Sequence, residues 1–411
     1  MTPISQDFAP PFKLIAPYFI IGAILFVISA FIPLGINLEN LHYLDPLVLG
    51  WVHLLLLGFV MMIIFGAMAQ LIPVTLEVGH FSIEFYYIIW PLLLIGTILM
   101  SCGFFFSSSL LPYGGTVVLI SMFIFLAEVF LTIKKVEKLN NIMKALLVSN
   151  TFLFIGVIVG IVLALTYAGA ISTDITSLLK VHVYLVVAGY ICITLMALSL
   201  VLLPMFGLSH NFSQKPLNLA VIIMTIGVSL VFLSGVFNLA SIDYLGYILS
   251  ILSLGLFLYE VFLIYKTRAR KENDIYVISL FVSFASLFLA IILIITYFIT
   301  YYHPLILTSG WLIFMGFFSF IISGHIYKIV PFLVWFEKFS PLVGKEKVPM
   351  LGDMIPITAA KFQFWFSLAG LVLSTMGLLF TSNDLFKAGA SFFIIGAIFL
   401  FKNLIYMIRF K

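Results

Sequence analysis

The sequence predicts an all-α integral membrane protein with about 12 transmembrane helices. Of its 411 residues, 64% are hydrophobic and only 9% are charged, whereas about a quarter of the residues in a soluble domain are charged. The apolar residues form long runs without the alternation typical of membrane β-barrel strands. This composition excludes a soluble enzyme, a disordered chain and a nucleic-acid-binding protein. Cys102 and Cys192 both lie in apolar runs, so neither a disulfide framework nor a cysteine zinc site is expected.

The apolar runs place the helices in order along the chain. Each run contains the roughly 20 apolar residues that a helix needs to cross a bilayer. The expected spans are residues 13–34, 46–74, 85–107, 114–134, 144–168, 178–205, 217–238, 243–266, 274–300, 305–336, 361–381 and 387–409. The longest connection, about 337–360, is interpreted as a solvated linker or, alternatively, as a docking surface for a partner. Residues 1–411 are therefore expected to form a single membrane domain.

The cationic residues predict the orientation of these spans. Only Lys180 and Lys387 fall in the loops after odd-numbered spans, and Lys328 falls inside the tenth span. The other 17 lie before the first span, after even-numbered spans or at the C-terminal end: Lys13, Lys134, Lys135, Lys138, Lys144, Lys215, Lys266, Arg268, Arg270, Lys271, Lys338, Lys345, Lys347, Lys361, Lys402, Arg409 and Lys411. Because cytoplasmic loops carry an excess of Lys and Arg, both termini are expected to be cytoplasmic. A multi-pass protein of the cell inner membrane is predicted.

An internal repeat relates the second, sixth and tenth spans. When these are aligned on a shared glycine, a proline follows 15 residues later in each, and a small residue stands seven residues before that proline. The glycines are Gly58, Gly189 and Gly316, the prolines are Pro73, Pro204 and Pro331, and the small residues are Gly66, Ala197 and Gly324. Small residues let transmembrane helices approach closely. The chain is therefore predicted to contain three tandem four-helix repeats, about 13–140, 141–272 and 273–411.

The fourth, eighth and twelfth spans support the same period. The fourth contains FLAEVFLTIKK and the eighth FLYEVFLIYKT, so Glu128 corresponds to Glu260. The twelfth reads FLFKNLIYMIRFK, which puts Lys402 at the same position. The two glutamates are interpreted either as interfacial carboxylates paired with nearby lysines or as part of a polar path.

Two histidines inside the membrane are the candidate ligands of a metal or cofactor. His53 lies about seven residues from the outer end of its span, which is roughly 10 Å deep at 1.5 Å per residue. His182 lies at a similar or shallower depth in the sixth span. Neutral imidazole is the usual ligand of haem iron and copper. The alternative is that each histidine donates one hydrogen bond to a neighbouring helix. In the aligned register Tyr184 and Trp311 stand at the position of His53.

A second polar group lies in the inner half of the tenth span. His325 and Lys328 are three residues apart, so they share one face of the helix. With Glu128, Glu260 and Lys402 they could line a proton or anion path. The alternative is a lysine that extends to the cytoplasmic interface with the histidine beside it. His80 and His210 follow the prolines of their spans and are expected to be solvated.

The threefold repeat resembles subunit I of the haem-copper oxidase superfamily, which includes oxygen and nitric oxide reductases. The outer histidine of HLLLLGF and the closing QLIP of the second span are similar to that family's pattern. The resemblance implies a role in respiration or nitric oxide metabolism. It gives His53 the position of a haem ligand and His182 that of a copper ligand. Other membrane subunits or a cytochrome c would be the partners, besides the lipid bilayer.

The sequence departs from that family at the other ligand positions. The tenth span reads TSGWLIFMG, with Ser309 and Trp311 where the family has histidines. The seventh and eighth spans, 217–266, contain no histidine. A complete binuclear centre for reducing oxygen or nitric oxide is therefore not expected. The opening PPFKLIAPYFIIGAILFVISAF also resembles the NnrS family of haem- and copper-containing membrane proteins. The alternatives are a transporter or channel, and a structural subunit without cofactors.

Overall fold

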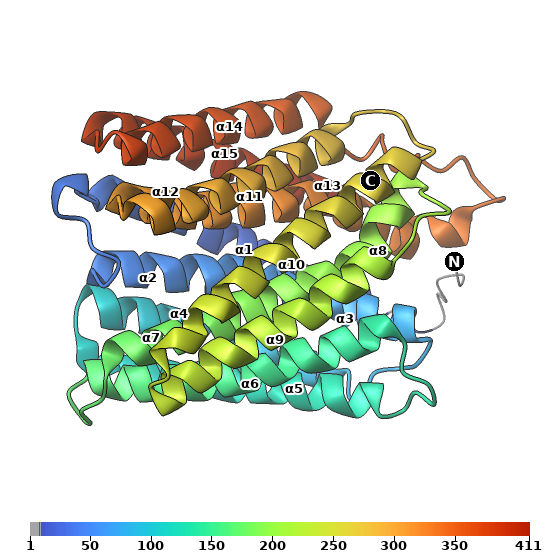
Figure 1. Cartoon of the computed structure of the whole chain (residues 1–411). Coiled ribbons are helices and arrows are strands. Elements are labelled where there is room, and N and C mark those ends of the chain that lie inside the picture. The colour runs from blue at the N-terminus through green and yellow to red at the C-terminus, as the bar shows by residue number, and fades with distance from the viewer. Residues whose placement is uncertain (1–7, 9) are drawn as a thin grey trace. The chain divides into compact units, whose positions relative to one another are not determined.

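The computed structural model describes residue 8 and residues 10–411. In this part of the chain, twelve helical segments are long and apolar enough to cross a membrane, and no β-strand forms. All twelve predicted spans are present, so the prediction of an all-α membrane protein is confirmed. Figure 1 shows these long helices, and the connection between α13 and α14 that extends beyond the ends of both.

The helices of the first half follow one another with short connections. They are α1 (Phe12–Phe31) with the 3-10 turn η2 (Ile32–Gly35), α2 (Pro46–Leu55), η4 (Leu56–Met61), α3 (Met62–Leu76), α4 (Glu84–Phe105), η5 (Ser108–Leu110), α5 (Leu111–Ile133), α6 (Asn141–Tyr167), α7 (Ile175–Val183), η6 (Tyr184–Cys192) and α8 (Ile193–Gly207). A further 3-10 turn, η3 (Leu38–Asn40), lies before α2.

The second half has the same character. Its elements are α9 (Lys215–Phe237), α10 (Ala240–Thr267), α11 (Ile275–Thr300), α12 (His303–Trp311), η7 (Leu312–Phe318), α13 (Ser319–Lys338), η8 (Ser340–Leu342), α14 (Ile357–Leu379) and α15 (Asn383–Ile408).

These helices form two compact units. Unit 1 consists of Met1–Glu77, Met100–Phe106 and Asn273–Lys411, and unit 2 of Val78–Leu99 and Ser107–Glu272. Unit 1 therefore contains α1–α3 and α11–α15, and unit 2 contains α5–α10 and most of α4. The single domain and the threefold repeat stay predictions.

Three of the described spans contain a π-helical segment. They are the second, sixth and tenth spans, with the segments η4, η6 and η7 respectively. The aligned glycines Gly58, Gly189 and Gly316 all lie within these segments. A π-helix widens the helical turn, and such segments occur frequently at functional sites. The three spans that share the glycine–proline pattern therefore also share a local backbone irregularity.

The same three glycines pack against the first helix of their own predicted repeat. A Cβ atom on Gly58 would lie 2.9 Å from the side chain of Leu25 in α1, and one on Gly189 would lie 2.8 Å from Phe152 in α6. On Gly316 it would lie 2.5 Å from Ser286 in α11. Close helix approach, the expected use of small residues in a membrane, is therefore present at all three positions.

A further glycine contact recurs between the third and fourth helices of each predicted repeat. A Cβ atom on Gly96 would lie 3.2 Å from the carbonyl oxygen of Gly114. The corresponding distances are 2.9 Å for Gly227 to Gly246 and 2.9 Å for Gly370 to Gly389. These contacts bring α4 and α5, α9 and α10, and α14 and α15 together in the same way.

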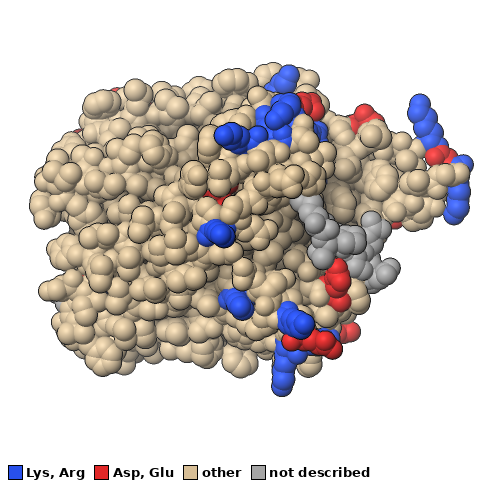
Figure 2. Space-filling view, turned by 45° about the vertical axis from the view of Figure 1, so that its right-hand side comes forward, with Lys and Arg blue, Asp and Glu red and all other residues tan. Residues whose placement is uncertain are grey.

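The visible surface carries few charged side chains, as expected of a membrane protein. Figure 2 shows a face that is mostly uncharged, with few Lys, Arg, Asp and Glu side chains. Large side chains exposed on the long helices include Ile226 on α9, Leu252 on α10 and Phe288 on α11. Such side chains are stable at the surface of a helix that is surrounded by lipid.

Candidate functional site

His53 lies on α2 in unit 1, just before the π-helical segment η4. The carboxylate of Asp45 caps this helix by accepting a hydrogen bond from the amide of Leu47 at 2.8 Å. One turn before the histidine, the carbonyl oxygen of Leu49 accepts a hydrogen bond from Nδ1 of His53 at 2.8 Å. A carbonyl can only accept, so Nδ1 carries a proton, and the lone pair of the neutral ring is on Nε2. This is the tautomer that binds a metal through Nε2.

The ring of His53 also contacts an aromatic side chain. The ring centroids of His53 and Phe104 are 4.9 Å apart, with 31° between the ring planes. The histidine is half-buried. The hydrogen bond and the ring contact together fix the orientation of the imidazole, as a ligand histidine requires.

His182 lies on α7 in unit 2, two residues before the π-helical segment η6. Its Nδ1 donates a hydrogen bond to the carbonyl oxygen of Gly156 in α6 at 2.8 Å. A Cβ atom on Gly160 would lie 2.9 Å from Cε1 of the histidine, so the glycine leaves the space that the ring occupies. His182 therefore makes the interhelical hydrogen bond expected of a packing histidine, in the tautomer that a ligand histidine would also have.

The other two aligned positions carry aromatic side chains. Trp311 stacks on Trp51 in unit 1, with centroids 5.4 Å apart and 21° between the planes. Phe386 and Phe393 contact Trp311 edge-on. In unit 2 the ring of Tyr184 lies 5.3 Å from that of Tyr247. Trp311 cannot ligate a metal, and its stacking fills the space beside α2 with packed rings.

The donor set limits the kind of centre that these residues fit. In the described part of the chain, no group of three or more His, Cys, Asp and Glu side chains is arranged to hold a metal ion. The arrangement fits a haem or copper bound through one histidine, with His53 the better oriented candidate. It does not fit a copper ion held by three histidines, nor a haem held between α2 and α12 by two.

In unit 1, His325 and Lys328 contact Tyr276 in the first turn of α11 and Asp274, the residue that caps this helix. The ammonium group of Lys328 donates to Oδ2 of Asp274 at 2.5 Å, and the two side chains are only 12% and 20% exposed. Nε2 of His325 lies 3.5 Å from the hydroxyl of Tyr276, and Nδ1 donates to the carbonyl oxygen of Ile321 at 2.7 Å. Asp274 was missed by sequence analysis, although its position before an apolar run is typical of a helix N-cap.

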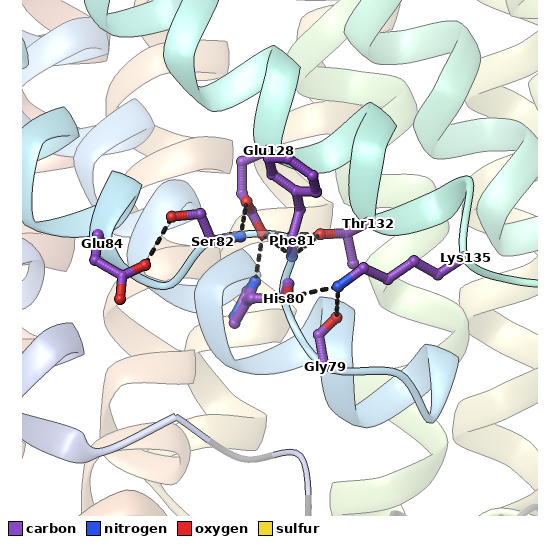
Figure 3. A network of polar contacts seen from close by, with 8 residues as sticks. All are labelled: Gly79, His80, Phe81, Ser82, Glu84, Glu128, Thr132 and Lys135. Atoms are coloured by element: carbon purple, nitrogen blue, oxygen red, sulfur yellow. Dashed lines mark hydrogen bonds and ion pairs between the residues drawn. The ribbon is translucent and has the colours of Figure 1, made fainter.

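Glu128 lies at the centre of a hydrogen-bond network in unit 2 (Figure 3). Its buried carboxylate accepts hydrogen bonds from Nδ1 of His80 at 2.8 Å, from the amides of Phe81 at 3.1 Å and Ser82 at 2.9 Å, and from the hydroxyl of Thr132 at 2.8 Å. The expectation that His80 is solvated is wrong, since its side chain is only 5% exposed. The carboxylate holds the segment before α4 against α5.

Lys135 completes this network from the end of the fourth span. Its ammonium group donates to the carbonyl oxygens of Gly79 at 3.1 Å and His80 at 2.7 Å. These contacts bind the loop that Glu128 also binds, as Figure 3 shows. The network therefore accounts for Glu128 as a structural residue.

The two residues aligned with Glu128 have different surroundings. Glu260 is 1% exposed and accepts one hydrogen bond, from the amide of Leu217 at 3.3 Å. Lys402 lies 6.0 Å from the ring of Phe399 in unit 1. The hydrogen bonds found for Glu128 and Glu260 lead to loop and helix residues rather than to the other members of the predicted polar path.

A third ion pair, which sequence analysis did not predict, lies in unit 2. Lys180 on α7 pairs with Asp243 in the first turn of α10. The pair ties the span of His182 to α10. Two features of the sequence could have indicated the pair: Asp243 stands next to an apolar run, and Lys180 is one of the few cations in its set of loops.

The chain is a polytopic helical membrane protein, and its fold is similar to that of a haem-copper terminal oxidase. A chain from the cryo-EM structure of a haem-copper terminal oxidase dimer superimposes with a TM-score of 0.70 at 14% sequence identity. The alignment covers 99% of this chain and 85% of that chain. No family model matches the sequence, and no curated protein matches it significantly. The predicted resemblance to this oxidase fold is thus confirmed at the level of structure.

Proposed function

We propose that this protein is a haem-copper-oxidase-like membrane protein that binds one haem or copper through His53. The observation that carries the proposal is the hydrogen bond from Nδ1 of His53 to the carbonyl oxygen of Leu49. Metal-ligating histidines almost always donate their other ring nitrogen to such an acceptor, which fixes tautomer and ring orientation. The fold similarity to a haem-copper terminal oxidase supports the same conclusion.

The residues around His53 would hold the ligand ring in a fixed position. Leu49 provides the acceptor, and Phe104 packs against the imidazole. The π-helical segment η4 begins three residues after the histidine and changes the direction of the side chains that follow. A bound haem or copper ion would supply one-electron chemistry or the binding of a small gas. The protein's contribution is ligand orientation in an apolar environment.

His182 is the second candidate ligand, for copper. Its Nδ1 bond to Gly156 supports the required tautomer. Tyr184 lies two residues after His182 in the sequence. In the alignment of the three spans on their glycines, Tyr184 rather than His182 stands at the position of His53. We infer that a copper ion bound here would have no more than two His, Cys, Asp or Glu ligands from the described residues, since these form no group of three such donors.

The donor set favours a role other than complete oxygen or nitric oxide reduction. We infer that the protein serves respiration or nitric oxide metabolism in the cell inner membrane. Other membrane subunits or a cytochrome c are the proposed partners. The stacked pair of Trp51 and Trp311 supports this inference, because an indole cannot replace a histidine as a ligand.

Optical spectroscopy of the purified protein tests the proposal. The protein is expressed with ample haem and copper, and spectra are recorded oxidised and reduced, with iron and copper measured on the same sample. A Soret band that H53A abolishes, with near-stoichiometric iron, is expected if haem binds. A copper content that H53A or H182A removes is expected if copper binds. H303A is the matched control, since His303 is exposed near the start of α12. The proposal would be overturned if the wild-type protein contained neither iron nor copper.

A transporter or channel is the second candidate function, and the ion pair of Lys328 and Asp274 favours it. Charged residues within membrane-spanning segments commonly mark the paths of ions or protons. Reconstituted vesicles test this reading, with K328M expected to abolish flux of the transported ion. Absence of flux and of both metals, with retained co-purification of another membrane subunit, would instead support a cofactor-less structural subunit.

A further inference from the structure

Glu260 is a buried carboxyl group that the proposed cofactor does not use. It lies on α10 in unit 2 and is 1% exposed. Its segment, EVFL, is identical to the one that contains Glu128. The two residues therefore form a natural comparison, because the same side chain in the same local sequence has two different environments.

The carboxyl group of Glu260 has little stabilisation from its surroundings. Oε2 accepts one hydrogen bond, from the amide of Leu217 at 3.3 Å. Oε1 is buried and has no hydrogen-bond partner. Glu128, by contrast, accepts hydrogen bonds from His80, from two backbone amides and from Thr132. An ionised carboxylate is favoured by such donors, and Glu260 lacks all but one of them.

The neighbouring helices provide no counter-charge to Glu260. α10 packs against α8 and α9, and it contacts α7 through Asp243, which is the partner of Lys180. α8 contains no ionisable side chain, and the only one on α9 is Lys215, which is exposed at its first residue. No ion pair joins Lys215 to Glu260 among the pairs found in the described part of the chain. The ionisable groups nearest in sequence are Tyr259, Tyr265, Lys266 and Arg268 on the same helix and its end, and His210 in the loop before α9 is exposed.

We infer that Glu260 is a proton-binding site, in which the side chain is held as a neutral carboxylic acid at neutral pH. A buried carboxylate without a cation and with one long hydrogen bond is unstable relative to its protonated form, because burial removes the water that stabilises the charge. The ligand of this site is a single proton. The site is independent of His53 and His182.

Infrared spectroscopy of the full-length protein in lipid tests the inference. A protonated carboxyl group has a carbonyl stretch that is separate from the amide and carboxylate bands and moves on exchange into deuterium oxide. We expect one such band in the wild type, its shift when the protein is labelled with carbon-13 glutamate, its loss in E260Q and its persistence in E84Q, because Glu84 is exposed. The glutamate label tests the wild-type protein without any substitution.

Several results would overturn the inference. A wild-type protein without a glutamate-dependent protonated band would have Glu260 ionised. A band that E260Q retains would assign the proton to a group other than Glu260. A band that appears only in K215M would mean that Lys215 normally holds Glu260 ionised. Failure of E260Q to fold would also count against it, because an amide is close in shape and charge to a neutral acid.

Discussion

Nδ1 of His80 donates a hydrogen bond of 2.8 Å to Oε1 of Glu128, although 48 residues separate the two in the sequence. Both side chains are buried, at 5% and 0% exposure. The same carboxylate accepts from the amides of Phe81 and Ser82. One side chain on α5 thus satisfies the donors of the loop that leads into α4. The carboxylate of Glu128 therefore holds a loop between two transmembrane helices in place. From the sequence alone, the same residue is interpreted either as an interfacial carboxylate paired with nearby lysines or as part of a polar path.

Removal of this carboxylate should destabilise the protein strongly. E128A removes the acceptor of the His80 imidazole, of the Ser82 amide and of the Thr132 hydroxyl, and each buried donor left unsatisfied costs about 1–3 kcal/mol. E128Q should destabilise the protein nearly as much, because the NH₂ group of glutamine is a donor and would face the donors that now bind the carboxylate. We expect both variants to unfold at clearly lower temperature in detergent.

The matched control for Glu128 is in the same network. Glu84 is exposed and accepts a hydrogen bond from Ser82 at 2.7 Å. E84Q should leave the unfolding temperature within about a degree or two, since surface substitutions change stability by about 0.5 kcal/mol or less. Equal stability of E128Q and E84Q would contradict the structural role of Glu128.

The positions of the transmembrane spans could be predicted from the sequence, whereas their ends could not. A run of apolar residues determines which segments cross the bilayer. The predicted twelfth span begins at residue 387, but α15 begins at Asn383, because Ser382 caps the helix by accepting from the amide of Leu385. Hydropathy does not register a capping hydroxyl. The predicted eleventh span likewise begins at residue 361, and α14 at Ile357.

The local geometry of the candidate site was less accessible to sequence analysis. Its glycines and prolines could be aligned, but a π-helix differs from an α-helix by one residue per hydrogen-bonded ring and leaves composition unchanged. The acceptors of His53 and His182, Leu49 and Gly156, are backbone atoms, which no residue type identifies. Asp274 was missed as the partner of Lys328 because their contact crosses from α11 to α13. Whether the histidines bind a cofactor stays a prediction.

The glycine contact between α9 and α10 should be intolerant of a methyl group. A Cβ atom on Gly227 would lie 2.9 Å from both the carbonyl oxygen of Gly246 and the hydroxyl of Ser250. G227A should therefore separate the two helices and lower stability by about 1–3 kcal/mol, the usual range for overpacking. The measurement is the unfolding temperature of the purified protein in detergent.

Gly255 provides the comparison for this substitution. It lies on α10, and a Cβ atom there would have no neighbour within 4 Å. G255A should raise stability by up to about 1 kcal/mol, because alanine favours a helix more than glycine does. If G227A were as stable as G255A, the proposed close contact would not be present in the protein.

The ion pair of Lys328 and Asp274 should be strongly coupled. K328M leaves a mostly buried carboxylate without its cation, and D274N leaves the lysine without its anion while keeping an N-cap. Each single variant should lose about 2 kcal/mol or more, as expected for a broken buried pair, and the double variant should lose less than their sum. Additive losses would exclude a direct interaction. The same variants in vesicles distinguish a structural pair, with unchanged flux, from a transport path.

The distribution of cations predicts which ends of the helices face the cytoplasm, and labelling can test it directly. Ser172 is exposed between α6 and α7, and Lys347 is exposed between α13 and α14. In a protein whose Cys102 and Cys192 are replaced by serine, S172C should react with a membrane-impermeant maleimide applied from outside the inner membrane. K347C should react only after the membrane is opened, because positively charged loops remain cytoplasmic. The reverse pattern would invert the topology and put His53 near the cytoplasmic surface, where the proposed cofactor would receive electrons from a different side of the membrane.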